Sequence, residues 1–257
     1  LQEPHKLIRA KDLQPETGGL FDPAMTGGMS GTKWSHVDLH EPMVNPVFEE
    51  PVRRLLGLTQ KEFDELHSKH GGAWFKQELS KINVDDRLKA LRERSLRLKG
   101  AALDDMVKQI KYLNALQANK LTPELAYVLT KIPVTPPVIR PVLPLKDGQL
   151  QVGDANLLYR DAFLANQKLH EVKGVLPTNE LMAPRKHLYD AVSAVFGVGE
   201  PVSPTTQKRE AKGYLAMITG TRPGSGFFQG KLMKRQQDVS GRATIAPDPT
   251  LSMDAIG

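Results

Sequence analysis

The sequence predicts an α+β fold that is mainly helical, in which helical hairpins are joined by extended loops and a few short strands. Apolar residues recur at helical spacing through residues 84–119 and again through 154–196. Prolines crowd residues 133–144 and exclude regular helix there, because proline fixes φ and lacks an N–H. Strand-like alternation is confined to short runs such as 37–39 and 243–246. Helices therefore carry most of the fold.

Composition limits the class of protein. The chain has 257 residues, enough for one large domain or two smaller ones, and its 40% hydrophobic content supports a core. A net charge of +6 is a mild basic excess that permits a polyanionic partner. The absence of cysteine excludes disulfides and thiolate zinc sites, and no apolar run approaches the ~20 residues that a membrane span needs. We expect a cytoplasmic protein without membrane contact. Because it starts at Leu1 rather than Met, we expect a fragment or a processed product.

The first 60 residues are expected to hold loop, a short strand at residues 37–39 and a helix that starts near Pro51 and ends at Gly57. Residues 1–33 are rich in glycine and show little periodicity, which predicts extended loop with short strands. His36 and His40 have the spacing of a helix face, but Pro42 and the alternating pattern argue against a helix, and no third ligand is in view. We interpret His36 as a hydrogen-bonded structural residue and predict no metal site.

Helices are predicted to fill the next part of the chain. Thr59 and Glu62 form a capping box for a helix of about eight residues. The apolar rhythm of residues 84–119 is interrupted at Gly100, which predicts two antiparallel helices. Basic residues stand mostly on the other faces of these helices, and we favour a solvated face over DNA contact. These residues are Arg87, Lys89, Arg92, Arg94, Arg97 and Lys99.

A proline-rich segment follows at residues 132–150. It must be extended and stiff, and its valines and isoleucine distinguish it from a polar linker. A rigid, apolar, protruding loop can act as a wedge, and Arg140 is a candidate phosphate contact. The alternative is a strand and loop packed on the protein's own core.

A helix pair and a basic loop are predicted after the prolines. Residues 154–172 and 180–196 have helical apolar stripes, with Asp154 as the N-cap of the first helix. Residues 197–218 contain glycine and proline and predict a loop, made basic by three residues: Lys208, Arg209 and Lys212. A generic surface loop is the alternative for that segment.

The stretch from residue 219 to residue 249 combines glycines with a basic cluster. Glycine lets the backbone approach a ligand closely, and Arg and Lys suit phosphate oxygens. We predict a loop that grips a nucleic-acid backbone. The candidate DNA-binding residues are Lys231, Lys234, Arg235, Asp238, Ser240 and Arg242.

Four stretches, in order along the chain, resemble the largest (β′) subunit of multisubunit RNA polymerases. Residues 33–39 (KWSHVDL) are similar to the family's "GHIEL" run, and residues 132–145 (IPVTPPVIRPVLPL) to its lid. Residues 154–160 (DANLLYR) resemble the start of its clamp coiled coil, and residues 232–251 (LMKRQQDVSGRATIAPDPTL) its switch-2 segment.

The resemblance implies clamp-type helical hairpins with short strands leading into a β-barrel. The implied segments are 1–60, an N-terminal clamp segment; 61–132, a helical hairpin region; 133–153, a lid-like loop; 154–197, the clamp coiled coil; 198–218, a rudder-like loop; and 219–257, a switch-2-like segment with the start of the barrel. The lid and the rudder of the family lie against the RNA–DNA hybrid. The residues implied in this contact are Pro137, Val138, Ile139, Arg140, Lys208, Arg209 and Lys212.

The implied function is to hold template DNA and the hybrid within a DNA-directed RNA polymerase, a nucleotidyltransferase. The chain lacks the bacterial four-cysteine zinc element and the family's magnesium-binding "NADFDGD" motif, so we expect no catalytic residue, metal ligand or cofactor in it and no activity alone. Magnesium is expected in the assembled enzyme. The implied partners are β-like and other polymerase subunits, template DNA, the hybrid and an initiation factor, in a bacterial or phage-infected cell.

Two other interpretations stay open. The chain could be a stand-alone basic nucleic-acid-binding module without polymerase activity, or a structural interaction protein built on a helical hairpin. Co-purification distinguishes these two from the polymerase interpretation, because only a polymerase subunit requires a β-like subunit and a chain that carries the aspartate motif.

Overall fold

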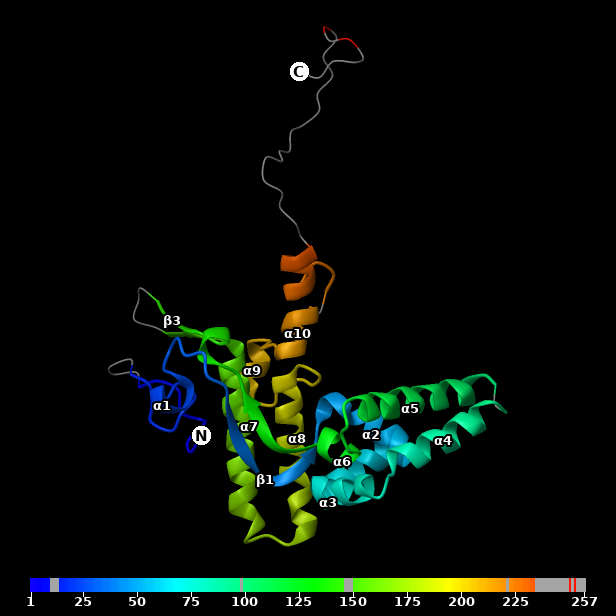
Figure 1. The fold of residues 1–257 in the computed structure, drawn as a ribbon. Helices are drawn as coiled ribbons and strands as arrows, with labels where there is room; N and C mark the ends of the chain where they lie inside the picture. Colours follow the sequence, from blue (N-terminus) through cyan, green and yellow to red (C-terminus); the bar gives the residue numbers. More distant parts are fainter. Residues whose placement is uncertain are drawn as a thin grey trace. The chain divides into compact units, whose positions relative to one another are not determined.

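The computed structural model describes most of the chain and divides it into two units. The described residues are 1–9, 14–97, 99–145, 150–220, 222–233, 250 and 252. The units are Leu1–Met217 and Ile218–Gly257. The first unit holds two hydrophobic cores and most of the helices and strands, and Figure 1 traces its elements. The mainly helical α+β class predicted from the sequence is confirmed.

The N-terminal residues are largely irregular, apart from one short helix that the sequence did not predict. Helix α1 (Pro23–Thr26) begins after Asp22, whose carboxylate accepts hydrogen bonds from the Ala24 and Gly18 amides. Leu20 and Phe21 are fully buried against the first core. The segment is therefore anchored rather than loose.

One antiparallel ribbon crosses the first unit. Strand β1 (Ser35–Val44) pairs with β2 (Val128–Val134), and their register shifts between Asp38 and Met43. The Nε2 atom of the exposed His36 ring lies 3.3 Å from the Nζ atom of Lys131 on the partner strand, so the predicted hydrogen bond is present. Within the ranges described above, no three His, Cys, Asp or Glu side chains form a metal-binding group.

After the turn η1 (Pro46–Phe48), the second core begins with α2 (Glu49–Leu56) and α3 (Gln60–Ser80), and the helices that follow α3 also contribute to it. The capping box between Thr59 and Glu62 is confirmed, but the predicted length of about eight residues is wrong. Gly71 interrupts α3 with φ +64° and ψ −167°, and the helix resumes because Phe75 and Leu79 return to the same core.

The predicted hairpin at residues 84–119 is confirmed. Helices α4 (Val84–Ser95) and α5 (Ala101–Ala118) run side by side in Figure 1, with Leu91 and Leu113 buried at their seam. Helix α6 (Pro123–Tyr127) follows and leads directly into β2. Local apolar spacing and the break at Gly100 sufficed to predict this part of the fold.

The proline-rich segment forms a short 3₁₀ turn and a small hairpin. Turn η2 (Pro137–Ile139) precedes β3 (Val142–Pro144), which pairs antiparallel with β4 (Leu150–Val152). Pro136, Pro137 and Val142 are buried, whereas Val138 and Ile139 are exposed. The segment is thus partly packed on the core, as the alternative interpretation supposed, and partly projects from it.

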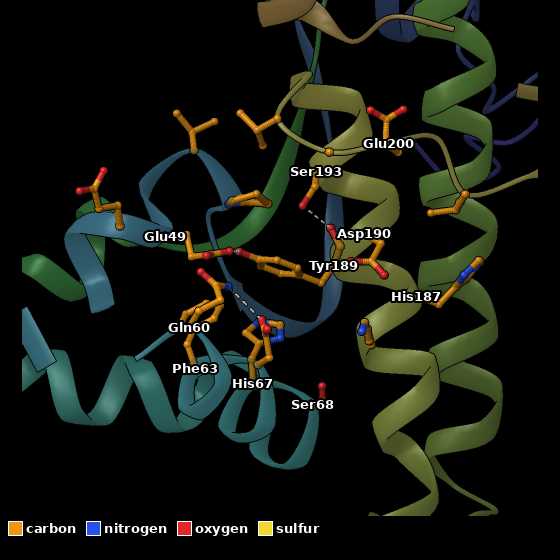
Figure 2. A pocket seen from close by; sticks show the side chains of 18 of the residues that line it. Glu49, Gln60, Phe63, His67, Ser68, His187, Tyr189, Asp190, Ser193 and Glu200 are labelled. Atoms are coloured by element: carbon orange, nitrogen blue, oxygen red, sulfur yellow. Dashed lines mark hydrogen bonds between the residues drawn. The ribbon is translucent and has the colours of Figure 1, made fainter. Parts of the chain in front are cut away.

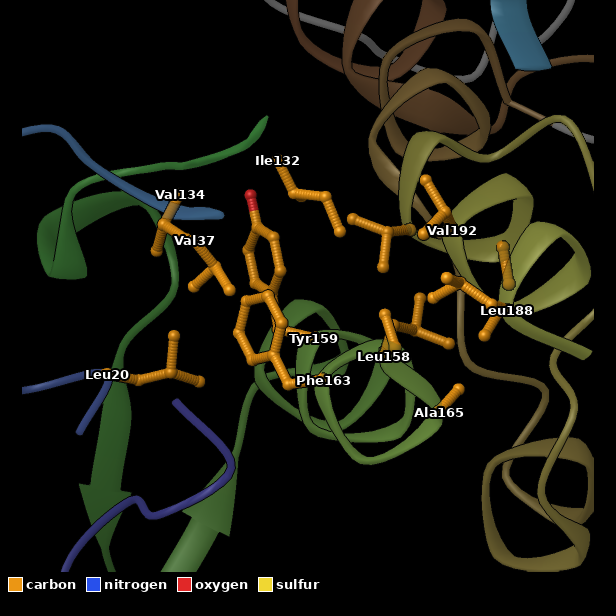
Figure 3. Packing of buried hydrophobic residues seen from close by; sticks show 14 of the residues in the cluster. Leu20, Val37, Ile132, Val134, Leu158, Tyr159, Phe163, Ala165, Leu188 and Val192 are labelled. Carbon is orange, nitrogen blue, oxygen red and sulfur yellow. The ribbon is translucent and has the colours of Figure 1, made fainter. Parts of the chain in front are cut away.

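The predicted helix pair is confirmed as α7 (Asp154–Lys173) and α8 (Met182–Phe196), linked through η3 (Thr178–Leu181). Figure 3 shows the stacked rings of Tyr159 and Phe163 within the first core, with Leu20 on one side and Leu188 of α8 on the other. The N-cap is Gly153 rather than Asp154. The prediction of Asp154 was wrong because its carboxylate contacts Arg209 and the Lys212 amide instead.

The prediction of a loop throughout residues 198–218 is also wrong. Helices α9 (Pro204–Lys208) and α10 (Tyr214–Thr219) occupy much of it. Ser203 caps α9 and Pro204 stands at its first position, a start signal that the sequence contains and that we did not weigh.

The second unit is described only in part. Its described residues include the end of α10 and the π-helix η4 (Phe228–Met233). The predicted strand at residues 243–246 and the start of a barrel lie outside the described residues. No helix in the described part of the chain combines the length and apolar character needed to cross a membrane.

Candidate nucleic-acid interface

The turn at Pro137–Ile139 presents two apolar side chains to solvent. Val138 and Ile139 are each 54% exposed, while Pro137 beneath them is buried. The Val138 amide donates to the Gly31 carbonyl at 3.1 Å, which fixes the turn against the N-terminal segment. The structure therefore places the predicted lid residues Val138 and Ile139 on the surface, on a backbone held from below.

Arg140 is buried, and the prediction that it meets a phosphate is wrong. Only 1% of it is exposed. Its Nε donates to the Thr135 carbonyl at 2.8 Å, Nη1 to Asn156 Oδ1 at 2.9 Å and Nη2 to the Leu20 carbonyl at 2.6 Å. The guanidinium carbon also lies 4.8 Å from the centre of the Phe21 ring. Burial lowers the pKa of Arg140 to about 10, so it stays charged at neutral pH.

Asn156 completes this arrangement and was missed from the sequence. It is fully buried, and its Nδ2 donates to the Arg140 carbonyl at 2.8 Å while its Oδ1 accepts from Arg140. The side-chain and backbone bonds together fasten the end of the exposed turn to helix α7. An asparagine on the apolar face of a predicted helix was the available signal, because buried amides are nearly always paired.

The hairpin of β3 and β4 adds further apolar surface beside the turn. Val142 faces Val152 across the ladder and is buried, whereas Leu143 is 53% exposed and Leu145 is 44% exposed. The Gly153 amide donates to the Pro141 carbonyl at 3.2 Å and closes the base of the hairpin. The exposed apolar residues of this region are Val138, Ile139, Leu143 and Leu145.

Arg209 and Lys212, two of the predicted rudder residues, lie at the base of the hairpin of β3 and β4. Arg209 Nη2 donates to the Val152 carbonyl at 2.6 Å, and its Nε lies 3.2 Å from Asp154 Oδ1. The Lys212 amide donates to the other Asp154 oxygen at 3.4 Å. Lys208, in the last turn of α9, is exposed. The structure thus joins the two predicted segments through Asp154 and engages Arg209 within the protein.

Two tyrosines support the same region from below. Tyr159 donates from its hydroxyl to the Pro133 carbonyl at 2.9 Å and accepts from the Thr135 amide at 3.3 Å. The hydroxyl of Tyr214 is hydrogen-bonded to that of Thr135. Burial raises the pKa of both Tyr159 and Tyr214, so the two phenols stay neutral at physiological pH and keep these hydrogen bonds. Neither tyrosine was singled out from the sequence as a supporting residue.

Trp34 is an exposed aromatic residue for which the sequence pattern predicts no role. It is 64% exposed. Its neighbour Ser35 pairs with Val134 in the ribbon, and Gly31 accepts the Val138 amide, so Trp34 lies between two links to the proline-rich segment. An exposed indole face suits stacking on a nucleotide base.

The switch-2-like segment is described only at its start. Lys231, in η4, is exposed. The other predicted DNA-binding residues, Lys234, Arg235, Asp238, Ser240 and Arg242, lie outside the described residues, and their roles stay predictions.

No family model matches the chain. The curated proteins that it resembles include β′ subunits of DNA-directed RNA polymerase from several bacteria. The chain is 29% identical over 215 residues to the β′ subunit of DNA-directed RNA polymerase from Staphylococcus haemolyticus, which covers 78% of the chain and 17% of that subunit. It is 31% identical over 205 residues to the β′ subunits of Paraburkholderia phymatum and Burkholderia vietnamiensis, which covers 76% of the chain and 14% of each.

The chain therefore spans no more than about one sixth of the length of the curated relatives it matches. The match runs through three quarters of the chain at about 30% identity, which confirms the resemblance stated from four short stretches. The chain is a homologue of one part of the β′ subunit of DNA-directed RNA polymerases.

Proposed function

We propose that this chain forms the part of a β′-like subunit that holds template DNA and the RNA–DNA hybrid during transcription. The observation that carries the proposal is the match of three quarters of the chain to β′ subunits of DNA-directed RNA polymerase. The exposed apolar turn on a buried polar anchor adds a physical reason, because a device that separates two strands must be both apolar and rigid.

The turn at residues 138–139 is the proposed separating element. Val138 and Ile139 offer apolar contact to the faces of bases and no hydrogen bond that would prefer one sequence. Arg140 and Asn156 hold the turn from inside the protein, so a strand pressing on it meets a fixed surface. A flexible loop of the same composition would be displaced by the strand instead of separating it.

Positive charge and one aromatic face are further proposed contacts with nucleic acid. In the first unit, the exposed Lys208 would contact phosphates without reading bases. In the second unit, we assign the same role to Lys231, Lys234, Arg235 and Arg242. Trp34 would stack on an unpaired base. Backbone contact without base readout suits an enzyme that must transcribe any sequence.

The proposed partners are β-like and other polymerase subunits, with the α7 and α8 pair as a docking element for an initiation factor. The proposed setting is the cytoplasm of a bacterium, or of a phage-infected one. The described residues do not group three carboxylate or histidine side chains, so the described part of the chain offers no fit for the catalytic magnesium ion. We propose that another segment or subunit holds it.

The proposal is tested by assembly and then by strand separation. A tagged copy of the chain, expressed in its native host, should retain a β-like subunit and a chain with the catalytic aspartates. Binding of the chain alone to an RNA–DNA scaffold, with no polymerase subunit retained, would support the stand-alone module instead.

The assembled enzyme then allows a matched comparison of surface variants. The pair Val138→Ser and Ile139→Ser should leave an overlong hybrid behind the enzyme, detected as extended protection of the RNA from a single-strand nuclease. Leu164→Ser, on an exposed position of α7, should not. Equal protection patterns in the two variants would contradict the role of the turn.

A further inference from the structure

A polar cavity of about 790 Å³ lies in the first unit, and none of its lining residues is assigned above to nucleic acid. It is bordered by η1, α2, the first half of α3, α8 and the loop at residues 198–202. Figure 2 shows Tyr189 of α8 reaching across toward Glu49 of α2, with His67 of α3 below them. The Tyr189 hydroxyl donates to Glu49 Oε2 at 2.6 Å and closes one side of the cavity.

Carboxylates outnumber the basic groups on the cavity wall. The acidic lining residues are Glu49, Glu50, Asp64, Asp190 and Glu200, and the lysine and arginine residues are Arg53 and Lys186. Glu49 accepts from Tyr189, and Glu50 pairs with Arg54 at 2.7 Å, so these two are already engaged. Asp64 accepts one bond, from Gln60 Nε2 at 3.2 Å. The remaining carboxylates on the cavity wall can therefore accept further hydrogen bonds, and the wall carries an excess of negative charge.

Asp190 carries a charge that its surroundings disfavour. Burial raises the pKa of Asp190, and the charge of Asp64 raises it further, against the opposing effects of Lys186 and His187. A cation placed between the two carboxylates would relieve both the desolvation and the mutual repulsion. Metal ions are a poor fit, because the described lining residues form no group of three metal ligands.

His67 supplies an independent sign of a missing partner at the cavity floor. It is 4% exposed, it lines the cavity, and its Nε2 has no hydrogen-bond partner in the protein. Its ring centre lies 4.5 Å from that of Tyr189 and 5.7 Å from that of Phe63. Burial, and secondarily Arg185, lower its pKa to about 4, so the ring is neutral at physiological pH and its Nε2 can accept a hydrogen bond.

Part of the lining is apolar and extends beyond the carboxylates. Val47 is 37% exposed and Val198 is 49% exposed, and Pro46, Pro201 and Val202 line the cavity with them. A small cation would leave these residues in water. A side chain carried on a polypeptide brings neighbouring residues that cover them.

We propose that this cavity binds an arginine side chain of a partner polypeptide, with apolar residues flanking that arginine. The guanidinium pairs with Asp64 and Asp190, lies near the aromatic rings of Tyr189 and His67, and donates to His67 Nε2. The flanking residues pack on Val47 and Val198. This site is independent of the proposed hold on nucleic acid, and failure of one leaves the other untouched.

The test uses the full chain and a fluorescent five-residue peptide with one central arginine between leucines. The matched control peptide carries citrulline, which keeps the shape of arginine and removes its charge. The arginine peptide should bind in an anisotropy titration, and Asp190→Asn and Asp64→Asn should each weaken it about tenfold. Glu93→Gln, on the exposed surface of α4, should not change it.

Several outcomes would overturn the proposal. They are equal binding of the citrulline peptide, unchanged affinity in both aspartate variants, and no binding of either peptide at millimolar concentration. Equal affinity for free acetyl-arginine amide would show that no polypeptide partner is recognised. Asp190→Asn removes a carboxylate whose charge is disfavoured by burial, so it should fold, and thermal unfolding checks this. If it does not fold, Asp64→Asn, on the exposed surface of α3, gives the same comparison.

Discussion

The guanidinium of Arg140 directs its hydrogen bonds into the protein. Its three partners come from the preceding turn, from helix α7 and from Leu20, which lies 120 residues away in the chain. Removing the side chain would leave buried acceptors, including Asn156 Oδ1, without a donor. An arginine in a proline-rich segment is therefore here a structural residue, and the exposed valine and isoleucine before it carry the surface.

Arg140→Ala should lower the free energy of unfolding by about 3–5 kcal/mol, because it breaks a buried charged network. Arg209→Ala is the matched variant: its side chain is 41% exposed, so screening by water should limit the loss to about 1 kcal/mol. Urea unfolding of both variants measures the difference. Equal losses would mean that Arg140 is not the anchor of the turn.

His67 should make stability depend on pH. Its pKa is about 4 in the folded protein and 6.5 in the unfolded chain, so the unfolded chain binds a proton more readily. The stabilisation that results from this difference in pKa is fully present above pH 6.5, falls as the pH drops, and is lost by about pH 4. The free energy of unfolding falls by about 3 kcal/mol over this range.

His67→Phe keeps an aromatic ring among Phe63, Phe75 and Tyr189 and removes the titration. Urea midpoints measured between pH 7 and pH 4 should decline less in this variant than in the parent chain. Parallel curves would show that other groups cause the acid sensitivity.

At the level of elements, the break in α3 is built around one buried ion pair. Arg185 of α8 donates to the Lys69 carbonyl at 2.6 Å, just before the break. It also pairs with Glu41 of β1 at 2.9 Å, and both side chains are buried. Gly71 permits this arrangement because its φ of +64° is unfavourable for other residues, and because a Cβ there would lie 2.5 Å from Glu41 Oε1.

Gly71→Ala should therefore cost more than Gly57→Ala. Both glycines have positive φ, but a Cβ at Gly57 meets nothing within 4 Å. We expect about 1 kcal/mol for Gly57→Ala and at least about 3 kcal/mol for Gly71→Ala, since the latter also displaces the buried ion pair. Thermal unfolding of the two variants gives the comparison, and similar losses would argue against a role for the ion pair at the break.

Local signals predicted the elements better than the site. The capping box at Thr59, the break at Gly100 and the apolar stripes of α7 and α8 act over a few residues, and each was confirmed. The burial of Arg140 and the break at Gly71 depend on partners far along the chain, which spacing does not show. The switch-2 residues lie mostly outside the described residues, so that part of the site still rests on resemblance.

At the scale of the whole molecule, the β1 and β2 ribbon contributes to two separate cores. Val37 and Ile132 belong to the core that contains α7 and α8, while Val44 and Val128 belong to the core around α2 to α6. Tyr159 of the first core supports the proline-rich segment, and Thr206 of α9 is hydrogen-bonded to Asp161 of α7. The acidic cavity borders α2, α3 and α8. One scaffold can thus present a nucleic-acid surface and a protein-binding site from different elements.

The most direct test of the nucleic-acid role is a photo-crosslink within the assembled polymerase. The photoreactive residue p-benzoylphenylalanine replaces Ile139, or Leu164 as a matched exposed position on α7, and the enzyme is stalled on an RNA–DNA scaffold with labelled RNA. We predict crosslinking of Ile139 to RNA at the upstream end of the hybrid and none from Leu164. Crosslinks from Ile139 to protein alone, or equal RNA labelling from both positions, would contradict the account.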